Sequence, residues 1–168
     1  MYKKIIILSI FIITSILISG CIDTNNGSRG NETIKSDMIP TINLPAGFTY
    51  LDAHETQVDI GNTSQKAIEG IYRSKTEDDE IYIQIFDIEN PQTLIDEYKS
   101  QYKDANYDPF TEITINGHKA TQVKYYITRN GKQLSKYNII WTTTNSMIKV
   151  GGSEDSQKVI ELAAATNS

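Results

Sequence analysis

Cys21 is the residue whose setting most clearly predicts a chemical modification. It is the only cysteine among 168 residues, and it directly follows Ile18-Ser19-Gly20. Upstream lie two lysines and an uncharged, largely apolar run over residues 5–20. A basic start, an apolar stretch and small residues at the junction are typical of a cleaved signal peptide, whereas a lasting transmembrane helix needs about 20 apolar residues. We therefore expect an apolar signal-peptide helix over residues 1–20, cleaved between Gly20 and Cys21.

The junction itself resembles the lipobox of lipoproteins secreted by prokaryotes, through Leu17 and Ile18-Ser19-Gly20-Cys21. The resemblance covers the first 21 residues and implies that the Cys21 thiol carries diacylglycerol and becomes the new N-terminus. Two or three acyl chains such as palmitate are enough for stable anchoring, where one is marginal. An ordinary cleaved signal with an incidental cysteine, and an uncleaved anchor, remain as alternatives.

The two histidines do not predict a metal or catalytic site. His54 stands between Asp52 and Glu55, and His118 follows a predicted hairpin turn. A cation shared by Asp52, His54 and Glu55 is disfavoured, because neighbouring residues on a strand point to opposite faces. We expect His54 to be a solvated loop residue and His118 to face water.

Other patterns that could carry chemistry are weak. The acidic run over residues 77–80 lacks the ligand spacing and central glycine of a calcium loop and is expected to be a solvated hairpin tip. The chain contains no Gly-x-Ser-x-Gly, no Ser-x-x-Lys and no glycine-rich phosphate loop. We expect a non-catalytic protein without cofactors or bound metal.

The net charge of the protein limits the classes of partner that it is expected to bind. Cleavage before Cys21 leaves 148 residues (168 − 20) with a formal charge of 14 − 21 = −7, since two lysines are lost and all acids remain. An acidic body disfavours nucleic acid, whose phosphates need clustered Lys and Arg, and disfavours lying flat on anionic lipid. The ten tyrosines suit half-buried sheet positions, with a ligand-stacking surface as the alternative.

A polar, glycine-bearing segment over residues 21–41 is expected to be the lipidated tether, followed by one globular domain over residues 42–168. Asn26, Asn31 and Asn62 each match the N-glycosylation pattern. Such matches arise by chance in a bacterium and could be used on the outer face of an archaeal cell.

The domain shows a strand-rich pattern with two helices. A helix is expected to begin at Pro91, capped by Asn90, and to end before Asp108. A second helix is expected after Gly151-Gly152, with Ser153 as its cap. Period-two alternation predicts strands at residues 48–51, 58–60, 66–74, 80–88, 110–115, 118–129, 133–143 and 147–150. The fold class is therefore α+β: a single antiparallel sheet of about six to eight strands, a meander in its second half, packed by helices.

The domain contains Asn116-Gly-His-Lys-Ala-Thr121, Tyr125-Tyr126 and a tryptophan-containing strand that ends in a glycine pair. Through these features the domain resembles PsbP-like domains found on secreted lipoproteins. The resemblance covers about residues 44–166 and implies a PsbP/Mog1-like sheet between helices, without a catalytic set. We expect an extracytoplasmic binding or accessory module, with an envelope protein as possible partner. The alternatives are a solute- or metal-binding lipoprotein with a Tyr/Asp/Glu pocket and an enzyme of unfamiliar type.

Overall fold

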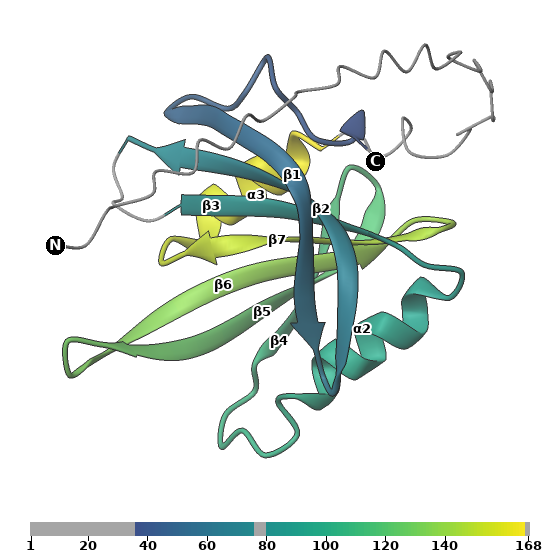
Figure 1. Ribbon diagram of the computed structural model, residues 1–168. Helices are drawn as coiled ribbons and strands as arrows, with labels where there is room; N and C mark the ends of the chain where they lie inside the picture. The colour runs from purple at the N-terminus through teal and green to yellow at the C-terminus, as the bar shows by residue number, and fades with distance from the viewer. Residues whose placement is uncertain (1–35, 76–79, 167–168) are drawn as a thin grey trace, which may run out of the picture.

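Seven antiparallel strands form one open sheet in the computed structural model, which describes residues 36–75 and 80–166. Along the chain, the elements are β1 (Phe48–Ile60), β2 (Thr63–Ser74), β3 (Glu80–Asp87), α2 (Pro91–Ser100), β4 (Phe110–Ile115), β5 (His118–Arg129), β6 (Lys132–Thr142), β7 (Ser146–Ser153) and α3 (Ser156–Ala164) (Figure 1). The predicted α+β class with a single antiparallel sheet and two helices is confirmed.

The strand order is β1-β2-β3-β7-β6-β5-β4, so α2 carries the chain from the middle of the sheet to its far edge. The second half then returns as a meander until β7 pairs with β3. Its two Asn-Gly turns have positive φ at both residues: 50° and 85° at Asn116-Gly117, and 52° and 74° at Asn130-Gly131. These are the values of type I′ hairpins, which match the twist of the strands as the sequence predicted.

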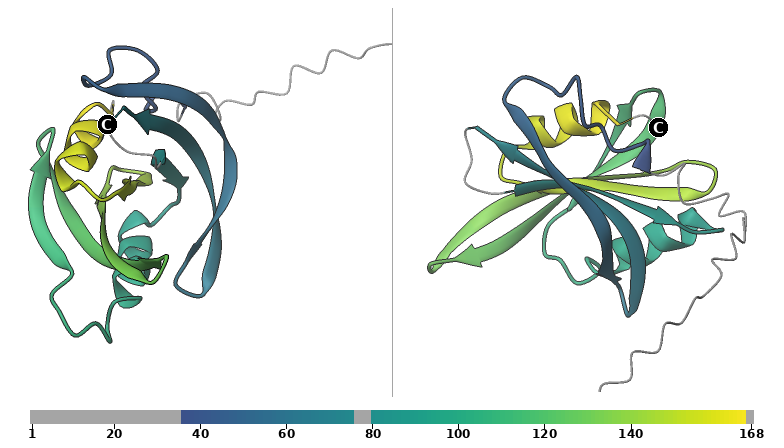
Figure 2. Two further views of the ribbon diagram at one scale, coloured as in Figure 1. Left: turned by 90° about the vertical axis from the view of Figure 1, so that its left-hand side faces the viewer. Right: turned by 45° about the horizontal axis from the view of Figure 1, so that its top comes forward.

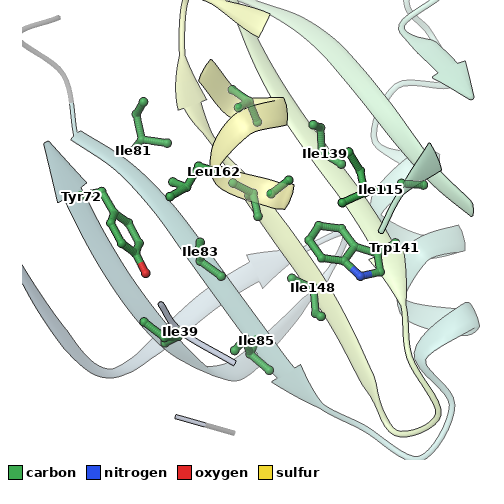
Figure 3. Close-up of a cluster of buried hydrophobic side chains, with 14 residues drawn as sticks. Ile39, Tyr72, Ile81, Ile83, Ile85, Ile115, Ile139, Trp141, Ile148 and Leu162 are labelled. Atoms are coloured by element: carbon green, nitrogen blue, oxygen red, sulfur yellow. The ribbon is translucent and has the colours of Figure 1, made fainter. Parts of the chain in front are cut away.

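The two helices cover opposite faces of the sheet, as the ribbon views show (Figures 1 and 2). On the α3 face, Leu162 and its helical neighbours pack on the alternating isoleucines of β3 and on Trp141 (Figure 3). On the α2 face, Leu94 and Ile95 join Phe86, Ile140 and Met147 in a second cluster. Both faces are therefore covered, which explains why the apolar residues of the central strands alternate with residues that are also mostly buried.

The packed part of the chain begins before residue 42. Ile39 is 4% exposed and belongs to the α3-face core, and the Tyr72 hydroxyl donates a hydrogen bond to the Pro40 carbonyl at 2.9 Å. The close approach requires Gly70 on β2, since a Cβ there would lie 2.6 Å from Cγ2 of Ile39. The end of the expected tether is thus part of the folded domain, because it supplies an apolar side chain that covers the sheet.

The N-terminal strands differ from the prediction. Residues 48–51 and 58–60 belong to one strand, β1, that pairs with β2 along its whole length. The polar residues between them broke the expected alternation, but they lie on an edge strand where side chains reach water. A register shift between Tyr50 and Asp52 accommodates the irregularity.

The ends of both helices also differ. Gly151-Gly152 lies inside β7 rather than ending it, and Asp155, not Ser153, caps α3 by accepting a hydrogen bond from the Gln157 N–H. At α2, Asn90 is the cap and Pro91 the first residue, as predicted, but the helix ends at Ser100. Hydrogen bonds of three-residue spacing replace the helical ladder from Gln101 to Ala105, so the chain turns there toward β4.

Candidate functional site

A lysine is buried under α2 on the central strand β7. Lys149 is only 8% exposed. Its Nζ donates to Oε1 of Gln84 at 3.1 Å and lies 4.9 Å and 5.7 Å from the ring centres of Tyr82 and Tyr98. Loss of hydration on burial lowers the pKa of Lys149 to about 8, and the nearby Glu69 carboxylate opposes that shift. The ammonium is therefore held by a polar contact and by aromatic faces rather than by a direct ion pair.

A row of polar side chains connects this lysine to the surface at the β1 edge. The strand registers place His54, Glu69, Gln84 and Lys149 opposite one another on β1, β2, β3 and β7. Gln84 donates to Glu69, and the other carboxylate oxygen of Glu69 lies 3.6 Å from Nε2 of His54. The row runs from the exposed His54 to the buried ammonium of Lys149. Each buried polar side chain along it contacts the next one in the row.

The structure corrects the expected setting of His54. It lies within β1 rather than in a loop, and its Nδ1 is 3.9 Å from a carboxylate oxygen of Asp52. Glu55 pairs with Ile68 in the next register position and so belongs to the opposite face. Asp52 and His54 share a surface that Glu55 does not, which is the separation that strand alternation predicts.

Asn138 on β6 organises the tyrosines around Lys149. Its amide nitrogen donates to the Tyr98 hydroxyl at 2.6 Å, and its amide oxygen accepts from the Tyr82 hydroxyl at 3.3 Å. The Tyr98 and Tyr102 hydroxyls are 3.2 Å apart. Burial raises the pKa of Tyr82 and of Tyr98 well above the ordinary tyrosine value, so both hydroxyls stay protonated and remain hydrogen-bond donors.

Next to this network the surface is hollowed into a groove of about 750 Å³. We call it the tyrosine groove; it lies between the segment that follows α2 and the β5–β6 hairpin, and it is lined by Tyr102, Tyr107, Tyr125 and Tyr126 together with small and polar residues. β4 pairs with β5 only as far as Val123, so the remainder of β5 lacks β4 beside it and its side chains are accessible. A volume in the range of about 300–1,000 Å³ is typical of small-molecule sites.

The buried network supports the wall of this groove. Tyr102 hydrogen-bonds with Tyr98, and Tyr125 hydrogen-bonds through its side chain with Tyr82. Tyr102 also packs edge-on against Phe110, with ring centres 5.7 Å apart. Tyr102 and Tyr125 are therefore held in place by hydrogen bonds to buried tyrosines. A binding surface that is ordered in advance reduces the cost of binding a ligand.

The remaining predicted residues lie elsewhere. His118 is half-buried at the first position of β5, and Asn62 is exposed in the turn between β1 and β2. Glu80 lies 3.9 Å from the Arg73 guanidinium, while Gly20, Cys21, Asn26, Asn31 and residues 77–79 fall outside the described residues. Within residues 36–75 and 80–166, no three His, Cys, Asp or Glu side chains come together in a way that could hold a metal ion.

Sequence reasoning missed Lys149, Asn138 and Tyr107. Lys149 alternates with Ile148 and Val150, so it reads as the solvent face of an ordinary strand. The sequence did predict helices on both faces of the sheet. A lysine on a central strand would then be shielded from water, and this was the available signal. Tyr107 lies in a segment expected to be helical, and its ring comes within 5.1 Å of Tyr126 only because the chain turns after α2.

In comparisons with known proteins, no family model, no curated protein and no solved structure matches the chain. In the part of the chain that the structure describes, neither helix combines the length and apolar character needed to cross a membrane. The resemblances to lipoproteins and to PsbP-like domains therefore stay predictions from the sequence.

Proposed function

We propose that this protein is a membrane-anchored extracytoplasmic lipoprotein whose α+β domain is a non-catalytic module that binds a small solute. The observation that supports binding is the tyrosine groove, whose wall is held by Asn138, Tyr82 and Tyr98. Pre-organised aromatic side chains lower the cost of immobilising groups when a ligand binds. The absence of clustered carboxylates among the described residues favours an organic solute over a metal ion.

Lys149 takes a supporting role in this proposal. Its ammonium donates to Gln84 and faces two tyrosine rings, so it stabilises the orientation of the side chains behind the groove. A lysine of lowered pKa can also be a nucleophile, but the groove is lined by Tyr102 and Tyr125 and not by Lys149. The geometry therefore supports binding more directly than it supports catalysis.

The proposed anchor is the diacylglyceryl group on Cys21, with cleavage after Gly20 and a spacer between lipid and domain. It is supported by the apolar run that precedes the only cysteine of the chain and by the acidic body, which favours a domain that stands off an anionic bilayer. Mass spectrometry of the native protein tests it directly, because an unmodified thiol still preceded by residues 1–20 would overturn the anchor. Cys21→Ser should abolish lipid labelling and leave a precursor that retains residues 1–20, and a wild-type protein found in the aqueous phase of a detergent partition would also overturn the anchor.

The binding function can be tested by thermal unfolding of the full chain against a solute library. A solute at 100 times its Kd stabilises the folded state by about 2.7 kcal/mol, which shifts the midpoint visibly. Tyr126→Ala should remove the shift, while Gln57→Ala, an exposed change on β1, should keep it. If no solute raises the unfolding midpoint of the wild-type protein, or if every such shift persists in Tyr126→Ala, solute binding at the groove is overturned.

A second candidate function is docking of another envelope protein at β1. This strand of 13 residues forms one edge of the sheet, and Leu51 on it is 38% exposed. An unpaired strand edge can accept a strand from a partner. Pull-down from detergent-solubilised envelopes tests this candidate, and loss of capture when Glu55→Pro places a proline within β1 would assign the contact to that edge.

A PsbP/Mog1-like fold is the finer structural proposal. It is supported by the antiparallel sheet, by the placement of helices on both of its faces and by the two Asn-Gly hairpins of the second half. Superposition of an experimental structure on PsbP-like domains tests it, and a different strand order in those domains would contradict it.

A further inference from the structure

The polar side chains of the tyrosine groove indicate what kind of ligand it accepts. Besides its tyrosines, the groove is lined by the amides of Gln101, Asn106 and Gln133 and by the carboxylate of Asp104. Within the part of the chain described by the structure, none of these four side chains has a hydrogen bond or ion pair with another residue. They are therefore available to a ligand.

Amides distinguish ligands by their hydrogen-bonding character. Each amide offers two N–H donors and one carbonyl acceptor. Hydroxyl groups can use both, because a hydroxyl donates once and accepts at its lone pairs, whereas an ammonium only donates and a phosphate or ionised carboxylate only accepts. Three amides beside tyrosine hydroxyls thus match a ligand that carries several hydroxyl groups.

The aromatic part of the groove matches the other face of such a ligand. Tyr107 and Tyr126 meet edge to face with ring centres 5.1 Å apart, and Tyr126 is 40% exposed. Ring faces carry partial negative charge and attract the slightly positive C–H groups of a flat, partly apolar molecule. A sugar ring presents C–H groups on its face and hydroxyls at its rim, so it can stack on a tyrosine while its rim reaches the amides.

Charge disfavours the two ionic alternatives. Asp104 is the only charged residue lining the groove, and it repels anions. For cations, one face of the Tyr126 ring already holds an ammonium of the chain itself, because Nζ of Lys124 lies 5.3 Å from its ring centre. A hydrogen bond with the Tyr126 side chain raises the pKa of Lys124, so this ammonium stays charged. This ammonium would repel a cationic ligand, whereas a neutral ligand meets no such repulsion.

We propose that the tyrosine groove binds a neutral saccharide, stacked on Tyr107 and Tyr126 and hydrogen-bonded at its rim by Gln101, Asn106 and Gln133. This rests on the proposed function of solute binding and specifies the ligand class. A groove of about 750 Å³ has room for more than one sugar ring. Short oligosaccharides are therefore the probes that the groove can hold along its length.

Isothermal titration of the full chain in detergent tests the proposal. The probes are the tetrasaccharides of the cello, chito, malto and manno series, with choline as the cationic probe and inorganic phosphate as the anionic one. At least one tetrasaccharide should bind, and Tyr126→Ala and Tyr107→Ala should each weaken it at least tenfold. Gln133→Ala should weaken it several-fold, while Gln57→Ala, the same change at an exposed site outside the groove, should not.

The possible outcomes separate the ligand class from the function. Choline binding that is lost in Tyr126→Ala, without saccharide binding, would overturn the saccharide class and leave solute binding in place. Saccharide binding unaffected by either tyrosine variant would move the site away from the groove and overturn the proposal. Binding of none of the probes would overturn the saccharide class, and with the silent solute library described above it would also overturn solute binding. Tyr107 and Tyr126 lie outside both hydrophobic cores, so their variants should fold. Circular dichroism of each variant checks that a loss of binding is not caused by unfolding.

Discussion

Gly151 on β7 lies opposite Asn138 on β6, and no side chain fits between them. A Cβ atom at Gly151 would lie 2.6 Å from Cγ of Asn138 and would overlap its amide oxygen. The missing side chain leaves room for the one amide that binds both Tyr82 and Tyr98. The glycine that seemed to end a strand in the sequence is therefore required inside that strand by the polar network.

This contact predicts a coupled pair of substitutions. Gly151→Ala should destabilise the domain by about 1–3 kcal/mol through overpacking. Asn138→Ala should cost about 1–3 kcal/mol, because the buried hydroxyls of Tyr82 and Tyr98 lose a partner. In the double variant the methyl group occupies the vacated space, so the total loss of unfolding free energy should be smaller than the sum. Denaturant titration followed by the fluorescence of Trp141, the only tryptophan, measures each value.

Gly131→Ala provides the control for that cycle. A Cβ at Gly131 would meet nothing within 4 Å, and the cost there comes only from its φ of +74°. Its effect should add to that of Asn138→Ala. Additive behaviour of the Gly151 pair as well would contradict the contact between Gly151 and Asn138.

Lys149 predicts an unusual dependence of stability on alkaline pH. Its folded-state pKa of about 8 lies below the ordinary 10.5, so between these values the unfolded chain binds more protons than the folded one. Unfolding free energy should therefore rise with pH from about 8 to about 10, by up to about 3 kcal/mol. Above pH 10 the unfolding free energy should fall again. Burial raises the pKa values of Tyr82 and Tyr98 in the folded state, so the unfolded chain loses these protons first and is stabilised by their loss.

Lys149→Met separates the lysine from other titrating groups. The variant keeps an apolar stem of similar length and should lose the rise between pH 8 and 10, which is measured by denaturant titration at each pH. Lys66→Met, on exposed β2 surface, should retain it. A wild-type curve that is flat or falls over this interval would contradict the burial of a charged Lys149.

The α3-face core predicts a large effect for a leucine on α3. Leu162 is fully buried against the sheet, as Figure 3 shows, so Leu162→Ala should cost about 2–5 kcal/mol of unfolding free energy. Leu51→Ala is the matched control, since Leu51 is partly exposed on the edge strand, and it should cost less than about 1 kcal/mol. Equal costs in thermal or denaturant unfolding would place Leu162 outside the core.

The packing of residues 38–40 predicts that part of the expected tether stabilises the domain. Tyr72→Phe removes the hydrogen bond to the Pro40 carbonyl and should cost about 1–3 kcal/mol, because that carbonyl is buried. The variant should also be cut faster by protease near residues 36–41. Tyr126→Phe, which alters an exposed tyrosine, should change neither quantity. Unchanged protection in Tyr72→Phe would show that this contact does not hold the segment.

Local sequence signals were enough for much of the sheet. The Asn-Gly pairs predicted two of the three hairpins of the meander because only a few residue types accept positive φ at successive positions. Asn90-Pro91 predicted the start of α2, since capping depends on adjacent residues. The same signals failed where a contact distant in sequence decided the outcome: Gly151 is conditioned by Asn138, and β1 is continuous because β2 pairs with it throughout.

The candidate site divides in the same way. The amino-acid sequence by itself determined the single cysteine after an apolar run, the acidic charge, the abundance of tyrosine and the alternation that produces an antiparallel sheet with helices. Only the tertiary structure decided which tyrosines share a groove, that Lys149 is buried and that Asn138 hydrogen-bonds with both Tyr82 and Tyr98 beside it. The physical reason is that burial and side-chain hydrogen bonding depend on which strands become neighbours, and the pairing of β3 with β7 joins Gln84 to Lys149 across 65 positions of sequence.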